Sequence, residues 1–460
     1  MVIKFQAPAP WWSRGLQLLW LFPQGEVIAE GEVWDLAVLV EDEGGRLSLS
    51  VTDGEKMEHK VIPAEPRGFL HTLFLLLSQF NQGSISPWGI LTGVRPGKIA
   101  ARLIDTCGLS GAIEELCSNW LLQRKNAQLL VVAVSNGYPL LKKTGLSVYI
   151  SVPFCPSRCD YCSFPSLPLD PWRDKIESYV RQGAEELKEL LLTCSLQGHI
   201  INSIYVGGGT PTALSPSQLN KLLAPARCWQ GEFTVEAGRP DTLTEEHLAV
   251  LKDLGVNRIS VNSQYPLDST LRAIGRKHTA QEFYAALDMA VSAGFDTVNT
   301  DLIVGLPGQT PEDFSGVISK LAAAGVGNVT IHALALKRGA GIKEQYLNEA
   351  QSRRIAQSAY GRLDALGFKP YYLYRQKNMA SNLENVGFGL PGSFCYYNIA
   401  SIAESEPVLG VGAGATSKLG WGDSFKTLNN PRDVNQYLAR CQELLERKLS
   451  WLEVDKGTCP

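Results

Sequence analysis

The sequence has no run of about 18 consecutive apolar residues, the length that a membrane-spanning helix requires. Its one short apolar run near the N-terminus is interrupted by Gln17. No basic region precedes this run and no small-residue cleavage site follows it, so a secretory signal is not indicated. We interpret the run as a strand, and we expect a cytoplasmic protein with no stable membrane association.

The sequence also lacks an excess of basic residues. It has 43 Lys and Arg residues against 46 Asp and Glu residues, a formal net charge of -3. A general attraction to nucleic acid is therefore excluded, and a pocket for an anionic substrate must have its own arginine and lysine side chains. At 460 residues, of which 45% are hydrophobic and 19% charged, the chain is long enough for two or three domains with a substantial core.

A disulfide framework is not indicated either. Ten cysteines in a chain of this length, without a secretory signal, favour free thiols and metal ligands. Three of them, Cys155, Cys159 and Cys162, lie within eight residues of sequence. We interpret the scattered ones as small buried hydrophobic residues, and among them we keep only Cys395 as a candidate ligand. They are Cys107, Cys117, Cys194, Cys228, Cys395, Cys441 and Cys459.

Between residues 144 and 337 the sequence alternates β-rich runs with amphipathic helical patterns, which predicts parallel βα units. The fold class is therefore α/β, with a partial (β/α)6 barrel. The expected strands are 147–154, 203–207, 232–237, 258–262, 297–304 and 328–334, and the helices between them include 174–193, 244–254, 280–293 and 311–324. Polar and glycine-rich segments follow the carboxyl ends of these strands, where barrels gather their chemistry.

Two further regions flank the predicted barrel at 144–337. Residues 1–140 are expected to form an N-terminal α+β module of unknown role, and residues 338–460 a mostly helical C-terminal extension that covers the substrate side of the barrel. The N-terminal module has strand patterns at 31–40 and 46–52 and helical patterns at 67–80 and 111–122. The extension has helical patterns at 342–366 and 433–449.

The segment Cys155-Pro-Ser-Arg-Cys159-Asp-Tyr-Cys162 places three thiols in a loop directly after the first predicted barrel strand. Three thiolates hold a four-iron cluster with one iron left without a protein ligand, where a cosubstrate can bind. A zinc site would show a second pair of Cys or His residues at partner spacing, and none is evident. The loop therefore predicts a [4Fe-4S] cluster in preference to zinc or inert core thiols.

Polar and glycine-rich residues at three other strand ends belong to the same predicted rim. Gly207-Gly-Gly-Thr-Pro-Thr212 follows the second strand, and its glycines permit close approach of a ligand to the backbone. Glu236 ends the third strand, where its carboxylate accepts hydrogen bonds from an amine or from ribose hydroxyls. Gln264, Arg276 and Asp301 lie at or just beyond strands four and five, and their position alone assigns them no role.

With these motifs the sequence resembles radical S-adenosylmethionine (SAM) proteins of the oxygen-independent coproporphyrinogen III oxidase group, and within it the HemZ type (coproporphyrinogen dehydrogenase). The resemblance rests on residues 148–155 with the cysteine loop, on Gly-Gly-Gly-Thr-Pro-Thr, and on Asp301-Leu-Ile-Val-Gly-Leu-Pro. The segments 91–98, 374–378 and 412–418 resemble the HemZ type in particular and extend the match over most of the chain.

The resemblance implies roles for individual residues. Cys155, Cys159 and Cys162 would ligate the cluster, flanked by Tyr149 and Tyr161. The implied SAM contacts are Gly208, Gly209, Thr210 and Glu236, with Thr416 in the 412–418 segment. Gln264, Arg276, Asp301 and Ala335 stand where the oxidases contact a second SAM molecule.

The resemblance implies a reaction as well: one-electron reduction of the cluster, cleavage of SAM to methionine and a 5′-deoxyadenosyl radical, and oxidative decarboxylation of coproporphyrinogen III propionates to the vinyl groups of protoporphyrinogen IX, in haem biosynthesis. An electron donor to the cluster is an implied partner.

The oxidases have a fourth cysteine two residues after the third, whereas Ser163 and Phe164 follow Cys162 here. Related haem chaperones share this aromatic version, so a haem-binding chaperone with His332 or Cys395 as axial ligand is the alternative. An RNA-modifying enzyme is a remote one, because no basic stripe is evident.

A tetracarboxylate substrate requires cationic partners with paired donors. From charge alone the candidates are Arg158, Arg239, Arg375 and Lys377, together with Arg95 and Lys98. For each of them a solvated surface position is the alternative.

Overall fold

The chain forms two compact units in the computed structural model, one of Met1–Val134 with Tyr374–Glu384 and the other of Ser135–Leu373 with Asn385–Pro460. No helix in the described part of the chain is long and apolar enough to cross a membrane. The residues that the structure describes are 2–19, 26–29, 31, 33–80, 86–162, 166–227, 229–335, 349–376, 382–421 and 425–454.

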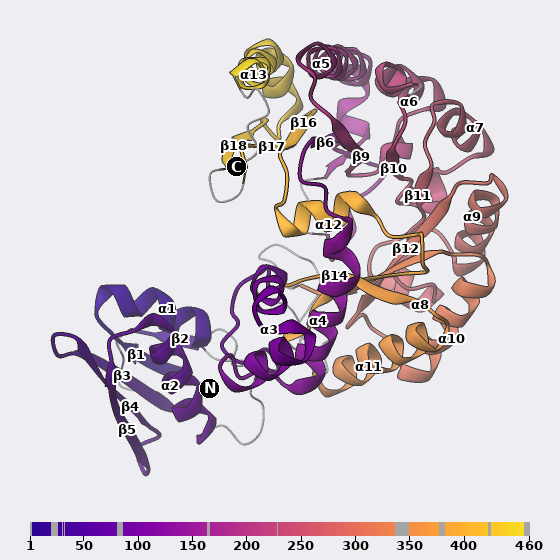
Figure 1. Ribbon diagram of the computed structural model, residues 1–460. Helices are drawn as coiled ribbons and strands as arrows, with labels where there is room; N and C mark the ends of the chain where they lie inside the picture. The colour runs from indigo at the N-terminus through magenta and orange to yellow at the C-terminus, as the bar shows by residue number, and fades with distance from the viewer. Residues whose placement is uncertain are drawn as a thin grey trace. The chain divides into compact units, whose positions relative to one another are not determined.

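The larger unit is built on a run of parallel strands, which confirms the α/β class and the partial (β/α)6 barrel (Figure 1). Each of the six predicted strands is present, within three residues of its expected ends, and each pairs in parallel with the next. They are β6 (Leu146–Val152), β9 (Ile201–Gly208), β10 (Glu232–Glu236), β11 (Arg258–Ser260), β12 (Thr297–Val304) and β13 (Asn328–Ala333).

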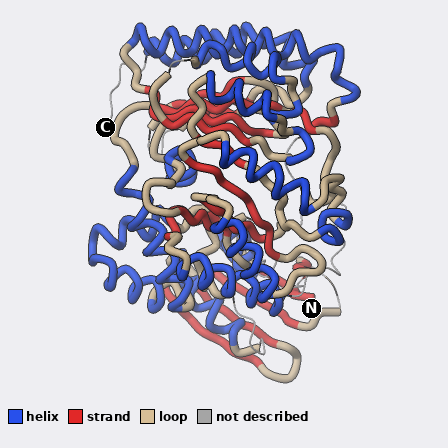
Figure 2. The backbone as a smooth tube through the Cα atoms, turned by 90° about the vertical axis from the view of Figure 1, so that its right-hand side faces the viewer, coloured by secondary structure: helices blue, strands red, loops and turns tan. Residues whose placement is uncertain are grey.

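Helices connect these strands and lie along the outer face of the sheet (Figures 1 and 2). They are α5 (Ile176–Gln197), α6 (Pro216–Leu223), α7 (Glu245–Asp253), α8 (Asp268–Ala273), α9 (Ala280–Ser292) and α10 (Pro311–Ala323). Side-chain caps start four of them, because the hydroxyls of Ser215, Thr244, Thr279 and Thr310 each accept a hydrogen bond from the backbone of the first helical turn. These capping residues mark in the sequence where helices α6, α7, α9 and α10 begin.

The barrel strands alternate between apolar and polar side chains. In β10 the apolar Phe233 and Val235 are fully buried, whereas Glu236 on the other face is only partly buried. Strands that are buried on both faces by apolar layers read as continuous hydrophobic runs, so this alternation marks one face of the sheet as polar. The polar side chains of the site described below lie on this inner face.

The C-terminal region extends the barrel sheet to eleven strands. It supplies the expected helices α11 (Glu349–Ala365) and α13 (Val434–Val454), and a shorter one, α12 (Tyr396–Ala403). The strands that it adds were not predicted: β15 pairs antiparallel with β13 at one edge, and β16 pairs in parallel with β6 at the other. These strands are β14 (Lys369–Tyr374), β15 (Asn385–Gly389), β16 (Val408–Val411), β17 (Thr416–Leu419) and β18 (Lys426–Asn429).

The smaller unit contains a five-stranded sheet of order β2-β1-β3-β4-β5 with its own core under helices α1 and α2. Its elements are β1 (Val2–Gln6), α1 (Ala9–Leu19), β2 (Glu26–Ile28), β3 (Leu36–Asp42), β4 (Arg46–Thr52), β5 (Met57–Pro63), α2 (Pro66–Ser78), α3 (Gly97–Ser118) and most of α4 (Arg124–Gly137).

The interpretation of the N-terminal apolar run as a strand is wrong for the residues that the structure describes, since residues 16–19 lie in helix α1. Buried residues recur at Trp11, Gly15, Leu18 and Leu19, which is the spacing of one helical face. A Cβ at Gly15 would lie 2.4 Å from the ring of Phe5, so the helix packs closely on β1. This packing makes the segment helical.

Candidate functional site

The three clustered cysteines lie in the loop that follows β6. Phe154–Cys155 (β7) pairs with Leu167–Pro168 (β8), which closes the loop at its base. Cys159 is buried, and Cys155 and Cys162 are partly exposed. The amide of Cys162 donates to the carbonyl of Cys159 at 3.1 Å and forms a turn between the last two thiols. Ser163 and Phe164, where the sequence departs from the oxidases, lie outside the described residues.

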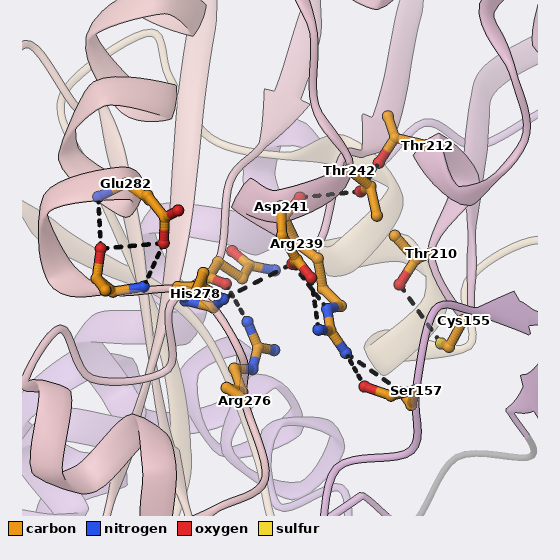
Figure 3. Close-up of polar contacts among 12 residues, drawn as sticks. Cys155, Ser157, Thr210, Thr212, Arg239, Asp241, Thr242, Arg276, His278 and Glu282 are labelled. Carbon is orange, nitrogen blue, oxygen red and sulfur yellow. Dashed lines mark hydrogen bonds and ion pairs between the residues drawn. The ribbon is translucent and has the colours of Figure 1, made fainter.

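The triple-glycine segment packs against the base of this loop. The amide of Gly209 donates to Val152 O at 2.7 Å, and that of Thr210 donates to Phe154 O at 2.8 Å. The Thr210 hydroxyl lies 3.4 Å from Cys155 Sγ (Figure 3). A Cβ at Gly209 would lie 2.6 Å from Phe154 O, so only glycine allows this approach. The structure therefore brings the two sequence motifs together.

The donor chemistry of the loop fits an iron–sulfur cluster. Thiolates are the protein ligands of such clusters, and three of them leave one iron open. Among the described residues, no three His, Cys, Asp or Glu side chains converge as ligands of a single metal ion. Burial raises the pKa of the Cys155 thiol, and the Thr210 hydrogen bond and the charge of Arg239 oppose this rise.

Arg239 holds one end of the cysteine loop. This side chain is only 3% exposed, and its Nη1 donates to the carbonyl of Ser157 at 3.2 Å and to its hydroxyl at 2.8 Å. Its Nε and Nη2 donate to the two carboxylate oxygens of Asp241 at 2.9 and 2.7 Å (Figure 3). His278 lies 3.7 Å from the same carboxylate. The Arg239 hydrogen bonds and the nearby His278 lower the pKa of Asp241, although burial alone would raise it.

Arg276 holds the other end. Its Nη2 donates to the hydroxyl of Tyr161 at 2.8 Å, and the guanidinium lies 5.9 Å from the centre of that ring. Its Nη1 donates to the carbonyl of Asn262, beyond the end of β11. Arg276 is 7% exposed, so both it and Arg239 are buried cations that connect the cysteine loop to the loops after β10 and β11.

Glu236 lies at the carboxyl end of β10, next to the glycine loop. The hydroxyl of Tyr205 donates to Glu236 Oε1 at 2.6 Å, and a Cβ at Gly207 would lie 2.9 Å from the Glu236 carboxylate. Burial raises the pKa of Glu236 to about 7, which the Tyr205 hydrogen bond opposes and nearby Asp301 reinforces. Behind it the rings of Tyr149, Tyr205 and Tyr397 stack with centroids 4.5 to 6.2 Å apart.

Asp301 belongs to a second polar group on the inner face. Its carboxylate accepts hydrogen bonds from Asn262 Nδ2 at 2.9 Å and Asn299 Nδ2 at 3.0 Å, and His332 Nε2 lies 3.9 Å away. The side chains of Asp301 and His332 are about a quarter exposed. A ligand in the barrel can therefore reach both.

Two of the other predicted SAM contacts lie at the ends of the neighbouring strands. Gln264 has a left-handed backbone with φ of 71° and forms a bridge with Leu302 on β12. Ala335 follows β13 and ends the described range 229–335.

Thr416 lies on β17, where its hydroxyl donates to Asn429 at 2.8 Å. Residues 410–414, which precede Thr416, form a second glycine-containing loop. This 410–414 loop reaches the barrel rim, because Ser151 Oγ donates to the carbonyl of Ala413 at 2.8 Å. Ser151 Oγ would also lie 3.0 Å from a Cβ at Gly208. The 410–414 loop thus lies beside the triple-glycine loop.

Five further cations were predicted from charge alone as partners of the substrate. Arg158 is exposed on the cysteine loop, and Lys377 lies outside the described residues. Arg375 belongs to the smaller unit, as do Arg95 and Lys98. The Arg375 guanidinium is buried there, donates to Leu91 O at 2.9 Å and lies over the Trp88 ring. Burial lowers its pKa to about 10.

Cys395 lies at the opposite end of the strands from the cysteine loop. It caps α12 and has its Sγ 3.4 Å from Glu232, which begins β10. It is 3% exposed, so of the two predicted haem ligands only His332 is accessible on the inner face.

Sequence reasoning missed the residues that position the site: Ser157, Tyr205, Asp241, Asn262 and Tyr397. Tyr205 had a usable signal, because it alternates with the apolar Ile204 and Val206 in a strand that ends in the glycine loop. The others act through contacts between distant loops, and no local pattern marks them.

The chain is similar to several known proteins. Residues 149–321 match the radical SAM superfamily. The chain is 34% identical over 403 residues to the oxygen-independent coproporphyrinogen-III oxidase-like protein HemZ of Bacillus subtilis (strain 168), which covers 83% of this chain and 80% of that protein. It is 32% identical over 297 residues to the heme chaperone HemW of Lactococcus lactis subsp. lactis (strain IL1403), covering 64% of this chain and 73% of that protein.

A solved structure of coproporphyrinogen III oxidase (HemN) from Escherichia coli, a radical SAM enzyme, superposes with a TM-score of 0.53 at 24% identity. It covers 65% of this chain and 70% of that one. At this level of identity the likeness shows a common fold.

Proposed function

Since the chain belongs to the radical SAM superfamily, and within it to the family of the HemZ and HemW proteins, we propose that it cleaves SAM at the barrel rim and decarboxylates the propionate side chains of coproporphyrinogen III. Membership of this superfamily implies a [4Fe-4S] cluster and SAM binding. The substrate and the outcome of the reaction are the proposal.

One observation carries the proposal: Cys155 Sγ lies 3.4 Å from Thr210 Oγ1, so the thiol loop and the glycine loop form one site. Cys155, Cys159 and Cys162 would hold the cluster, which supplies the electron that splits SAM into methionine and a 5′-deoxyadenosyl radical. The backbone of Gly208 to Thr210 would bind the methionine part of SAM beside the open iron.

Glu236 is the group suited to the amino end of SAM. Its carboxylate is held by Tyr205 and by the backbone of Gly208, and it accepts hydrogen bonds from an ammonium group. The tyrosine stack behind it fixes its orientation. A second SAM molecule at Gln264, Arg276, Asp301 and Ala335 stays a prediction of the resemblance.

In the proposed reaction each of two propionates loses one hydrogen atom, CO₂ and one electron, and becomes a vinyl group. The hydrogen atom ends on 5′-deoxyadenosine, and an electron acceptor takes the electron. The polar inner face of the barrel suits a substrate with several hydrogen-bonding groups, which supports a porphyrinogen there.

The test is a turnover assay under anaerobic conditions with reconstituted protein, a chemical reductant, SAM and coproporphyrinogen III. We expect protoporphyrinogen IX and 5′-deoxyadenosine, with two vinyl groups formed per product molecule. A Cys159→Ala variant is the control and should form neither product. Cleavage of SAM by the wild-type protein without any vinyl product would exclude the decarboxylase.

A haem chaperone is the second candidate, favoured by the HemW relatives and by His332, which is 27% exposed on the inner face. It predicts stoichiometric haem binding with an absorption spectrum of an imidazole-ligated haem. The spectrum should change in His332→Ala and stay unchanged in Cys395→Ala. The wild-type protein binding no haem would remove this candidate.

SAM affinity should depend on pH through Glu236. Because its pKa is raised to about 7, the carboxyl group is mostly neutral at pH 6 and mostly charged at pH 8. An ammonium group prefers the carboxylate, so affinity should rise by up to about tenfold from pH 6 to pH 8, and binding near pH 7 should release a proton.

Calorimetry in buffers of different ionisation enthalpy measures this proton release. Glu236→Gln should bind more weakly and lose both the pH dependence and the release. Tyr205→Phe should raise the pKa of Glu236 further and move the rise in affinity to higher pH. Wild-type affinity that does not change between pH 6 and pH 8 would contradict the assignment.

A further inference from the structure

Arg239 and Arg276 each donate hydrogen bonds to the cysteine loop, one near its start and the other near its end. Arg239 donates to both oxygens of Ser157, which lies between Cys155 and Cys159 (Figure 3). Arg276 donates to Tyr161 beside Cys162. Both guanidinium groups are at least nine-tenths buried. The loop is thereby tied to the ends of β10 and β11 as well as to its own strand.

Arg239 is itself fixed in direction. Asp241, two residues on, takes two of its donors in a paired arrangement at 2.9 and 2.7 Å, which leaves only Nη1 to point at Ser157. The backbone of the same turn is held as well, because Gly238 N donates to Ser260 O at 3.1 Å, and the Thr242 hydroxyl donates to Arg239 O at 2.9 Å. These contacts use four of the five N–H donors of the buried Arg239 guanidinium, so its main partners are the cysteine loop and Asp241.

We propose that Arg239 is a positioning residue that holds the cysteine loop in its cluster-binding conformation, and that its positive charge makes the bound cluster easier to reduce. This proposal rests on the cluster site proposed above. It replaces the prediction from charge alone that Arg239 binds a substrate carboxylate.

The charge argument follows from the position of the guanidinium. Reduction adds one negative charge to the cluster, and cluster potentials depend on net charge, hydrogen bonds and solvent exposure. The Arg239 guanidinium donates to Ser157, which is two residues from Cys155 and two from Cys159, through the nitrogen that does not bond Asp241. The cation is therefore closer to the cysteine loop than its counter-ion Asp241. A buried cation there stabilises the reduced state more than the oxidised state.

The positioning role is tested on the protein without cluster, by the rate at which N-ethylmaleimide labels Cys159. This thiol is only 8% exposed, so labelling requires the loop to open. In Arg239→Met we expect labelling about tenfold faster than in the wild type, because a charge-assisted hydrogen bond that closes the loop is lost. Arg239→Lys keeps the charge but not the paired geometry and should give an intermediate rate.

Cys194 on α5 serves as the internal reference, since it is fully buried and far in sequence from the loop. Its labelling must stay slow in every variant that is folded. If Cys194 also becomes accessible in Arg239→Met, the labelling experiment uses the Ser157→Ala variant in place of Arg239→Met. That variant removes the 2.8 Å hydroxyl contact alone, and we expect about twofold to threefold faster labelling of Cys159.

The electrostatic role is tested by a redox titration of the reconstituted cluster, followed by its paramagnetic resonance signal. In Arg239→Met we expect the equilibrium constant for one-electron reduction to fall about tenfold, which is about 59 mV. Arg239→Lys should stay close to the wild type. The double variant Arg239→Met/Asp241→Asn, in which the net local charge is restored, should recover much of the shift.

The outcomes separate this proposal from the proposed function. Unchanged Cys159 labelling and an unchanged potential in Arg239→Met, with Cys194 protected, would overturn it. If Arg239→Met lowers only the substrate affinity and leaves Cys159 labelling and the potential unchanged, Arg239 binds the substrate instead. If the wild type takes up no cluster, the proposed function fails, while the labelling experiment still decides whether Arg239 positions the loop.

Discussion

Replacement of Gly209 by alanine should lower SAM cleavage about 100-fold, because it separates the two loops that make the site. The added Cβ would lie 2.6 Å from Phe154 O and 2.8 Å from Pro153 O. Both are backbone atoms at the base of the cysteine loop, so no side-chain rotation relieves the clash. The hydrogen bond from Gly209 N to Val152 O, at 2.7 Å, prevents the glycine loop from moving away without further loss.

The measurement is 5′-deoxyadenosine formation in the presence of a chemical reductant, together with the iron content of the reconstituted protein. We expect iron to be retained in large part, since the three cysteines are unchanged, and SAM affinity to fall with the rate. Gly316→Ala is the matched control, because Gly316 lies in α10 and an added Cβ there meets nothing within 4 Å. Equal activity of the two variants would show that the glycine loop does not bind SAM.

The barrel could be predicted from the sequence because its signals are local. Each strand is a short β-rich run of three to eight residues. Four of the six helices that follow start at Ser or Thr caps, and several are followed by Gly. The order of motifs along the chain then places the cysteine loop, the glycine loop and Glu236 at one rim, since the carboxyl ends of parallel strands lie together.

The partners of the site residues could not be predicted in the same way. Arg239 and Ser157 are 82 residues apart, and only the folded barrel brings them together. Charge alone suggested a substrate-binding arginine, because a sequence does not show whether a cation is already paired. The same limit applies to β16, a short apolar strand whose parallel pairing with the distant β6 no local pattern indicates.

A buried ion pair at the edge of the barrel makes the larger unit sensitive to the loss of either partner. Lys448 on α13 is 0% exposed and donates to the Glu186 carboxylate on α5, which is 2% exposed, and to the carbonyl of Gly410 at 2.6 Å. The other carboxylate oxygen accepts from Gly412 N at 3.0 Å and from the Tyr437 hydroxyl at 2.7 Å. The pair thus fixes helices α5 and α13 and the 410–414 loop.

Lys448→Met should lower the free energy of unfolding of this unit by about 3–5 kcal/mol, because it leaves the Glu186 carboxylate buried without its cation. The double variant Glu186→Gln/Lys448→Met removes both charges and should recover a large part of that loss. Equilibrium unfolding in urea, monitored by circular dichroism, measures both effects.

The matched control for Lys448→Met lies on the same helix. Arg440 pairs with Glu443 at 3.0 Å, but both side chains are nearly half exposed, and water screens the pair. Arg440→Met should therefore leave the unfolding midpoint unchanged within error. SAM affinity should fall in Lys448→Met and stay normal in Arg440→Met, because only the first variant releases the 410–414 loop. A Lys448→Met protein as stable as the Arg440→Met protein would mean that α13 and this loop are held by apolar packing instead.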